Sequence, residues 1–149
     1  MNNAQLVNLD SGKTDWRTPK DFFAKLDEEF HFTLDPCSTH ENALCEKHYT
    51  EEENGLVQEW GGETVFMNPP YSRQTGVWIE KAYRESLKGA CVVCLIPARP
   101  DASYWHDYIL PYATEIRFVR GRLRFSGSSE SAPFPSAVVV FGRKMKGMK

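Results

Sequence analysis

The chain of 149 residues has 41% hydrophobic and 26% charged side chains, which is ordinary for a globular domain and is enough to bury a core. No apolar run reaches the roughly 20 residues that a membrane-spanning helix needs, and Met1 to Asp10 lack the basic and apolar regions of a secretory signal, so we expect a cytoplasmic protein without membrane contact. The net charge of −2 excludes no class of partner by itself.

The small net charge hides an asymmetry between the two halves of the chain. Residues 1–75 carry 14 acidic and six basic side chains, whereas residues 76–149 carry six acidic and 12 basic ones. Four arginines of the second half lie close together in sequence: Arg117, Arg120, Arg122 and Arg124. Such a cluster is typical of a surface that contacts phosphates, and a solvated strand edge is the alternative interpretation.

The two ends of the chain differ from its middle. Residues 1–13 are polar and unpatterned and predict a flexible N-terminus, residues 14–143 predict a single domain, and residues 144–149 form a basic tail. The first helix is predicted to start with Thr18 as its cap and Pro19 at its first helical position. Apolar residues at helical spacing mark its buried face: Phe22, Phe23, Leu26 and Phe30.

A short strand is predicted over residues 32–36, and Asp35 lies where this strand ends. A carboxylate at such a place either bonds local backbone N–H groups or binds a ligand. Residues 39–63 are polar and acidic and contain at most one short strand, near residues 48–50. We therefore expect a truncated sheet.

The apolar run over residues 65–67 predicts a buried strand, which Pro69 and Pro70 end. The turn that follows presents an amide, rigid backbone carbonyls and an aromatic ring together. The amide oxygen of Asn68 and the carbonyl of Pro69 can each accept one N–H of a planar amine, which directs the nitrogen lone pair at an electrophile, while Tyr71 stacks on the ring. An ordinary proline turn is the other interpretation of these four residues.

The second half of the chain alternates helices and strands. Helices are predicted from Val77 to near Gly89 and over residues 102–110, and strands over residues 90–96, 115–119 and 136–141. Residues 121–135 are rich in Gly, Ser and Pro, and they form either a loop that contacts nucleic acid or closes over the site, or a disordered connection. The alternation predicts an α/β three-layer domain, with a mostly parallel sheet and antiparallel C-terminal strands.

Two groups of cysteine and histidine residues are candidate metal ligands. Cys91 and Cys94 lie three residues apart in a predicted strand, so they point to opposite faces and cannot bind one ion. Four other residues have a spacing that would suit a tetrahedral zinc ion: Cys37, His40, Cys45 and His48. We predict no metal site, because Cys37 and Cys45 fall at positions that a family resemblance explains without metal.

The sequence Asn68-Pro69-Pro70-Tyr71 resembles the catalytic motif of S-adenosylmethionine-dependent amino methyltransferases. More closely, the chain is similar to the small phage-type, Dam-like DNA N6-adenine methyltransferases. The matching stretches follow one another in order and cover most of the chain from Thr14 to Phe141: residues 14–19, residues 34–37, Asn42-Ala43 with Cys45 and Tyr49, Gly55-Leu56 with Trp60, residues 68–72, residues 95–97, and residues 121–123 with Phe125. The ordered set is much more specific than the four-residue motif.

The resemblance implies a Rossmann-like methyltransferase fold, S-adenosylmethionine as cofactor, and catalytic roles for Asn68, Pro69, Pro70 and Tyr71. It also implies a cofactor site from two segments, with Trp16, Thr18 and Pro19 in the first and Asp35, Pro36, Cys37 and Asn42 in the second. Most relatives of the superfamily carry a glycine-rich turn at residues 35–38, and this chain does not. The cofactor site therefore cannot be located from glycines.

The activity implied is methyl transfer to the N6 amine of adenine in double-stranded DNA, with the base flipped out of the stack and held by Tyr71. Two alternatives stay open. The same motif serves methyl transfer to cytosine N4, RNA adenine or protein glutamine, and a non-catalytic DNA-binding module can keep the same fold. The target sequence is not readable, and its specificity is either loose or supplied by a homodimer.

Overall fold

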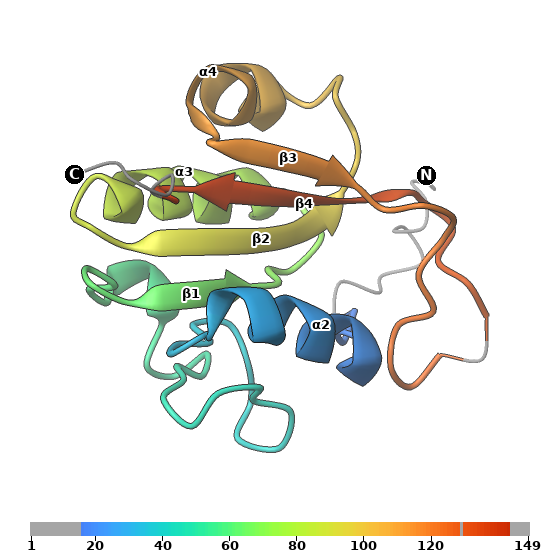
Figure 1. Cartoon of the computed structure of the whole chain (residues 1–149), viewed down its shortest axis with the longest axis horizontal. Helices are drawn as coiled ribbons and strands as arrows, with labels where there is room; N and C mark the ends of the chain where they lie inside the picture. Colours follow the sequence, from blue (N-terminus) through green and yellow to red (C-terminus); the bar gives the residue numbers. More distant parts are fainter. Residues whose placement is uncertain (1–15, 129, 144–149) are drawn as a thin grey trace.

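The computed structural model describes residues 16–128 and 130–143, so the predicted flexible N-terminus (residues 1–13) and basic tail (residues 144–149) lie outside the described residues. The centre is a four-stranded sheet in the order β1-β2-β4-β3 (Figure 1). Its strands are β1 (Thr64–Met67), β2 (Cys91–Pro97), β3 (Glu115–Phe118) and β4 (Ser136–Phe141).

The strand directions confirm the predicted α/β class. β1 is parallel to β2, whereas β4 is antiparallel to both of its neighbours, β2 and β3. Among these four strands, β4 is therefore the one that runs against the others. The predicted antiparallel C-terminal pair is present, and β3 forms the half-exposed edge that its alternating sequence indicated.

The strand predicted over residues 32–36 is reduced to isolated bridges beside β1. Leu34 pairs with Val65 and Asp35 pairs with His48, both in parallel. Pro36 limits this segment because proline has no N–H for a further ladder bond. The sheet is thus truncated on this side, as expected. After residues 34–35 the chain first adds the His48 bridge on one side of them and then β1 on the other side. Such a change of side is a topological switch point, which opens a crevice at the carboxyl ends of the strands.

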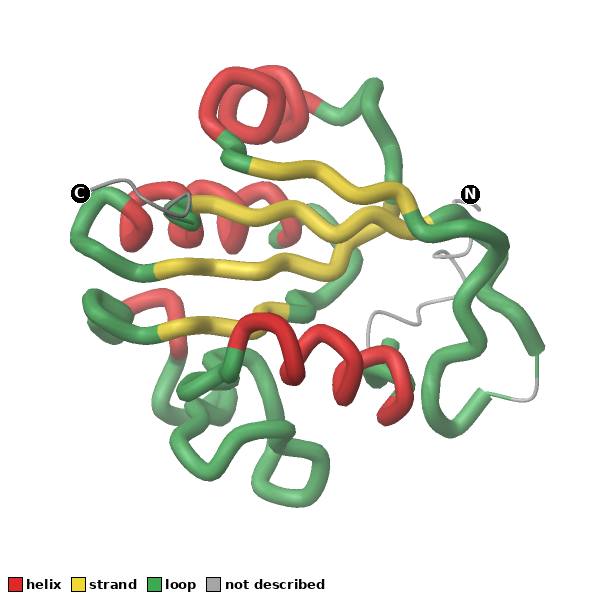
Figure 2. The backbone as a smooth tube through the Cα atoms, in the orientation of Figure 1, coloured by secondary structure: helices red, strands yellow, loops and turns green. Residues whose placement is uncertain are grey.

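Helices cover both faces of the sheet (Figures 1 and 2). α2 (Lys20–Phe30) packs on one face, and α3 (Thr75–Ser86) packs on the other. A further helical segment beside α3 consists of η2 (Trp105–Ile109), which has π-helical hydrogen bonding, and α4 (Leu110–Tyr112). The helix predicted over residues 102–110 is therefore present, with π-helical hydrogen bonding in its middle part. None of the described helices is long and apolar enough to cross a membrane.

Alternation along the strands divides the core into two apolar clusters. Val93 and Leu95 of β2 belong to the cluster under α2, while Cys94 and Ile96 belong to the cluster under α3. Cys91 packs against the first of these clusters, so Cys91 and Cys94 lie on opposite faces as predicted. Both pack in the sheet, and burial raises the pKa of each thiol, which disfavours the reactive thiolate.

The start of α2 differs from the prediction. Pro19 is the N-cap residue with an extended backbone (φ −62°, ψ 135°), and no side chain of the described residues caps the helix. Thr18 was predicted to be the cap, and this is wrong because its hydroxyl accepts a hydrogen bond from the amide of Asn68 instead. The predicted apolar face is correct, with Leu26 and Phe30 buried.

An ion-pair network connects the end of α2 to β3 and to the end of β4. Arg117 of β3 donates two hydrogen bonds to the carboxylate of Glu29 (2.8 and 2.5 Å) and one to Glu115 (2.6 Å). Arg143 contacts both carboxylates as well, at 2.7 Å from Glu29 and 3.0 Å from Glu115. Its guanidinium lies 4.5 Å from the ring centroid of Phe30. The network therefore holds α2 against the sheet edge.

Replacing Glu29 by glutamine (Glu29→Gln) should flatten the acid dependence of stability. The hydrogen bond from Arg117, helped by Arg143, lowers the pKa of Glu29 from 4.5 to about 2. A carboxyl with a lowered pKa stabilises the fold fully above its unfolded pKa, and this contribution is lost as the pH falls through the folded value. The free energy of unfolding should therefore fall more steeply between pH 4.5 and about 2 in the wild type than in the variant.

The expected difference is about 0.5 kcal/mol, since solvent screens a pair whose side chains are each about one-third exposed. Urea denaturation at several pH values measures it. The matched control is Glu28→Gln, which removes an exposed carboxylate one residue away and outside the network. If Glu28→Gln and Glu29→Gln gave the same pH dependence, the network would contribute nothing.

Candidate active site

The Asn68–Tyr71 turn begins at the carboxyl end of β1, as predicted. It is tied to the start of α3 by the buried residue Thr75. The Thr75 hydroxyl donates to the carbonyl of Pro70 (2.7 Å) and accepts from the backbone N–H of Ser72 (3.0 Å). The sheet on one side and the helix on the other thus fix the turn at the mouth of the crevice.

The side-chain amide of Asn68 is held in one orientation. Its nitrogen Nδ2 donates to the carbonyl oxygen of Trp16 (2.6 Å) and to the hydroxyl of Thr18 (2.9 Å). A backbone carbonyl can only accept, so the NH₂ group must be the end that faces Trp16. The oxygen Oδ1 is buried and accepts no hydrogen bond from the described residues. An unsatisfied buried acceptor costs about 1–3 kcal/mol, which a ligand donor would recover.

A cavity of about 740 Å³ opens beside this turn. Nine of the predicted site residues line it: Trp16, Thr18, Asp35, Pro36, Cys37, Asn42, Asn68, Pro69 and Pro70. Pro19, Tyr71 and the four arginines of the predicted DNA contact do not line it. The volume falls within the range of roughly 300–1,000 Å³ that is usual for small-molecule sites.

Among the cavity residues that sequence reasoning did not assign to the site, two carry polar groups that lack a partner in the part of the chain that the structure describes. The hydroxyl of Ser38 and the indole N–H of Trp78 line the cavity and are buried without a partner among the described residues. Most buried polar groups have partners, so unpartnered ones at a cavity indicate a ligand. Together with Oδ1 of Asn68 they offer a donor, an acceptor and a hydroxyl that can act as either. Trp78 gave no signal in the sequence, because it lies on the apolar face of α3.

Gly55 shapes the floor of the same cavity. A Cβ atom at this position would lie 2.2 Å from the carbonyl oxygen of Pro36 and 3.1 Å from the Trp78 ring. Only glycine permits this approach of the two loops. The turn predicted at Asn54-Gly55 was the available signal, but its contact with Pro36 was not foreseen.

Asp35 bonds local backbone N–H groups, which was one of the two predicted roles of its side chain. It is 4% exposed, and its carboxylate accepts from the backbone N–H groups of Cys37 (3.3 Å) and Leu44 (3.0 Å). Burial raises the pKa of this carboxyl, and the two N–H groups act in the opposite direction. A carboxylate has further acceptor sites, and Asp35 lines the cavity, so its cofactor-binding role stays a prediction.

Tyr71 is buried rather than displayed. Only 1% of its surface is exposed, and its hydroxyl donates to the carbonyl of Leu95 (3.0 Å). The rings of Phe125 and Phe134 pack edge-on against it, with centroids at 6.2 and 5.6 Å. Stacking of Tyr71 on a base therefore requires that the segment carrying these two phenylalanines moves away.

The four arginines of the predicted DNA contact fall into two groups. Arg117 is committed to the ion pairs with Glu29 and Glu115. The other three are exposed and have no acidic partner among the described residues: Arg120, Arg122 and Arg124. They alternate with Leu123 and Phe125, which pack into the core cluster under α2, so they share the outer side of this segment.

The residues considered for zinc do not gather into a site. His40 and His48 contact each other through their ring nitrogens at 2.9 Å, and the other nitrogen of His48 faces the carbonyls of Cys45 and Glu46. Within residues 16–128 and 130–143, no group of three or more His, Cys, Asp or Glu side chains is arranged to hold a metal ion.

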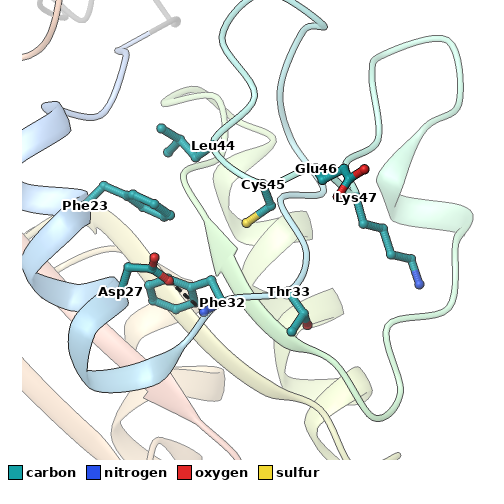
Figure 3. Close-up of a pocket in the computed structure, with 8 residues that line it drawn as sticks. All are labelled: Phe23, Asp27, Phe32, Thr33, Leu44, Cys45, Glu46 and Lys47. Carbon is teal, nitrogen blue, oxygen red and sulfur yellow. Dashed lines mark hydrogen bonds between the residues drawn. The ribbon is translucent and has the colours of Figure 1, made fainter.

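A smaller cavity of about 500 Å³ lies between α2 and the segment 44–47 (Figure 3). Figure 3 shows Phe23 and Asp27 on one side and Cys45 on the other. Burial raises the pKa of the Cys45 thiol to about 12, so it is not a nucleophile near neutral pH. Asp27 already accepts the N–H of Phe32 (2.8 Å). This cavity contains no part of the Asn68 turn, and the larger one is the candidate site.

Substituting Tyr71 by alanine (Tyr71→Ala) should lower the free energy of unfolding by about 3–5 kcal/mol, the usual cost of emptying a large aromatic position in a core. The control Tyr71→Phe keeps the ring and loses only the bond to Leu95, at about 1 kcal/mol. Urea denaturation of both variants measures this. A Tyr71→Ala protein as stable as the wild type would show that the ring is not part of the core.

Comparison with known proteins finds a matching family and related phage proteins. The family model described as DNA N-6-adenine-methyltransferase (Dam) matches residues 7–148. The chain is 32% identical over 110 residues to the DNA N-6-adenine-methyltransferase of Escherichia phage T1, covering 72% of this chain and 45% of the relative. It is 30% identical over 111 residues to that of Haemophilus phage HP1, covering 73% of this chain and 64% of the relative.

The matched region thus spans less than two thirds of the length of either phage relative. The family model, by contrast, covers nearly all of this chain, including the cavity, the Asn68 turn and every strand of the sheet. On this match, the chain belongs to the DNA N-6-adenine-methyltransferase (Dam) family.

Proposed function

We propose that the chain transfers a methyl group from S-adenosylmethionine to the N6 amine of adenine in DNA. The observation that carries this proposal is the buried oxygen of Asn68, which has no donor among the described residues although the amide nitrogen has two acceptors. The site needs an N–H donor at this point, and an exocyclic amine supplies one. The names of the phage relatives support adenine in DNA as the source of that amine.

The protein groups act on the amine by holding its protons. Oδ1 of Asn68 accepts one N–H, and the carbonyl of Pro69, which accepts no hydrogen bond from the described residues, takes the other. Both bonds draw the lone pair out of conjugation with the ring. The lone pair then forms the new N–C bond, and one proton leaves the nitrogen for solvent. Catalysis is thus mainly orientation, which the Thr75 contacts to the turn maintain.

S-adenosylmethionine, when bound, supplies an electrophilic methyl group on a sulfonium whose C–S bond breaks as the N–C bond forms. The residues that would hold it line the large cavity: Trp16, Asp35, Pro36, Cys37 and Asn42, with Ser38 and Trp78 added by the structure. Thr18, which the resemblance placed in this set, also lines the cavity, but its hydroxyl is used by the Asn68 amide. The mixture of apolar rings and unpartnered polar atoms suits a cofactor with an aromatic base and a charged amino acid end.

DNA contact is proposed for the exposed arginines Arg120, Arg122 and Arg124, and Arg117 is left out because acidic groups already satisfy it. Three phosphate contacts should make binding to duplex DNA salt-dependent. The target base must leave the duplex stack, at a cost of a few kcal/mol. Tyr71 can stack on the flipped base only after Phe125 and Phe134 withdraw, which links base entry to the segment that also carries the arginines.

The strand order supports a three-layer, Rossmann-like methyltransferase fold, truncated beyond the His48 bridge. In this fold the cofactor binds in the crevice at the carboxyl ends of the Leu34–Asp35 segment and of β1. The Asn68 turn, which follows β1, borders this crevice. Homodimer formation and a cytoplasmic location stay predictions.

The first test is transfer of labelled methyl groups to unmethylated duplex DNA, followed by nucleoside analysis. Label in N6-methyladenine is expected. Asn68→Ala should lower kcat about 100-fold or more, as loss of one preorganised hydrogen-bonding group does in other enzymes. Binding of S-adenosylmethionine by the variant, followed by calorimetry, should persist and shows that the fold is intact.

The other outcomes are equally specific. Label in N4-methylcytosine, RNA or protein glutamine would keep the role of Asn68 and change the substrate. Cofactor binding without transfer to any amine, or transfer by Asn68→Ala at the wild-type rate, would contradict the proposal. A chain that binds DNA but not S-adenosylmethionine would be a binding module.

A further inference from the structure

We propose that the segment Trp16–Thr18 is a positioning device that fixes the Asn68 amide as an acceptor, so that this point of the site admits amino bases and rejects bases with a carbonyl there. The inference rests on the proposed function for its catalytic consequence. The orientation itself is a property of the chain alone and can be measured without any substrate.

The two acceptors of the Asn68 NH₂ group have different roles. The Trp16 carbonyl, at 2.6 Å from Nδ2, cannot donate, so it sets which end of the amide faces it. The hydroxyl of Thr18, at 2.9 Å, takes the second proton and leaves the nitrogen no donor for a ligand. With both protons used inside the protein, Asn68 offers a ligand only its oxygen.

The segment is itself anchored from the far end of the chain. The backbone N–H of Ser126 donates to the carbonyl of Arg17 (2.9 Å), and its hydroxyl donates to the carbonyl of Thr18 (3.1 Å). The rings of Phe125 and Phe134 pack edge-on against Trp16, with centroids at 5.5 and 5.1 Å. In Figure 1 the loop between β3 and β4 passes beside the start of α2, where these contacts form.

The consequence concerns the substrate class. The Asn68 oxygen and the Pro69 carbonyl are both acceptors, so a planar NH₂ group satisfies both of them. A base with a carbonyl at the same place, such as guanine or thymine, would set oxygen against oxygen and leave both acceptors buried and unpaired. Sites built in this way discriminate strongly, because the wrong ligand leaves polar groups without partners.

The sharpest test is Asn68→Asp, since a carboxylate is at least as good an acceptor as an amide. If the only need were an acceptor, this variant would keep its activity. An ionised carboxylate, however, sets an oxygen against the Trp16 carbonyl, whereas a protonated carboxyl can donate to it as the amide does. At pH 8.5 the variant should show less than about a tenth of the wild-type kcat, because a tenfold loss corresponds to the loss of one good hydrogen bond.

The ratio of variant to wild-type kcat should rise as the pH is lowered from 8.5 to 5.5, because the carboxyl gains a proton. A general loss of structure would not produce such a rise, and the wild type has no titrating group at this position. A ratio that does not change with pH, whatever its level, would overturn the orienting role of the Trp16 carbonyl.

Thr18 is tested by Thr18→Val, which keeps the shape and removes the acceptor, with Thr18→Ser as the rescuing variant. Valine should lower kcat roughly tenfold while the KM for S-adenosylmethionine changes less than twofold, and serine should restore kcat. The matched control is Thr33→Val, which also loses a side-chain hydrogen bond, to Glu63 at 2.7 Å, but lies outside the large cavity. A change confined to the KM for the cofactor would show that Thr18 contacts the cofactor, and would overturn its positioning role.

An NMR measurement on the free protein separates this inference from the proposed function. The side-chain NH₂ signals of Asn68, assigned by their loss in Asn68→Ala, should exchange slowly with solvent. Thr18→Val should speed the exchange, and Thr18→Ser should not. Fast exchange in the wild type would overturn the inference even in an active enzyme. Slow exchange in a chain that methylates nothing would support the fixed orientation of the Asn68 amide and reject the proposed function.

Discussion

The site depends on one hydrogen bond, from the Asn68 amide nitrogen to the Trp16 carbonyl. This contact joins the end of β1 to the segment before α2, and both of them line the cavity. Because a carbonyl has no proton to give, the bond also determines which atom of Asn68 is left over. The buried oxygen without a partner is therefore a result of the geometry and not a defect of packing.

The aromatic cluster beside this bond explains how such a polar contact is kept in place. Trp16, Tyr71, Phe125 and Phe134 meet edge-to-face on the α2 side of the sheet. Each of these four side chains is nearly or fully buried, so the backbone of these residues has little room to move. Packed side chains of this kind keep the Asn68 amide oriented in the free chain, before any ligand binds, which is how preorganised sites reduce activation barriers. The same packing keeps Tyr71 away from any ligand in the free chain.

Sequence reasoning located the strands and nine of the residues that line the cavity, but not the contacts that orient Asn68. β1 and β4 were recognised because short apolar runs between turn signals leave few alternatives. The cavity residues were found through an ordered family pattern. The roles of Thr18 and Arg117 were missed, because their partners are 50 and 88 residues away in sequence. A threonine before Pro19 has the local pattern of a cap, and only the folded chain shows that its hydroxyl is used by Asn68.

The pairing of Arg17 with Ser126 has a consequence for the order in which the molecule assembles. The hydrogen bond from Ser126 to the Thr18 carbonyl closes a loop of 108 residues, and contacts of such long range form late because the chain must first lose much conformational freedom. A chain still emerging from the ribosome would thus have its Asn68 strand before it has the anchor for the segment that orients Asn68. The orientation of the Asn68 amide would therefore be secured only after the segment around Ser126 has been synthesised and has packed against residues 16–18.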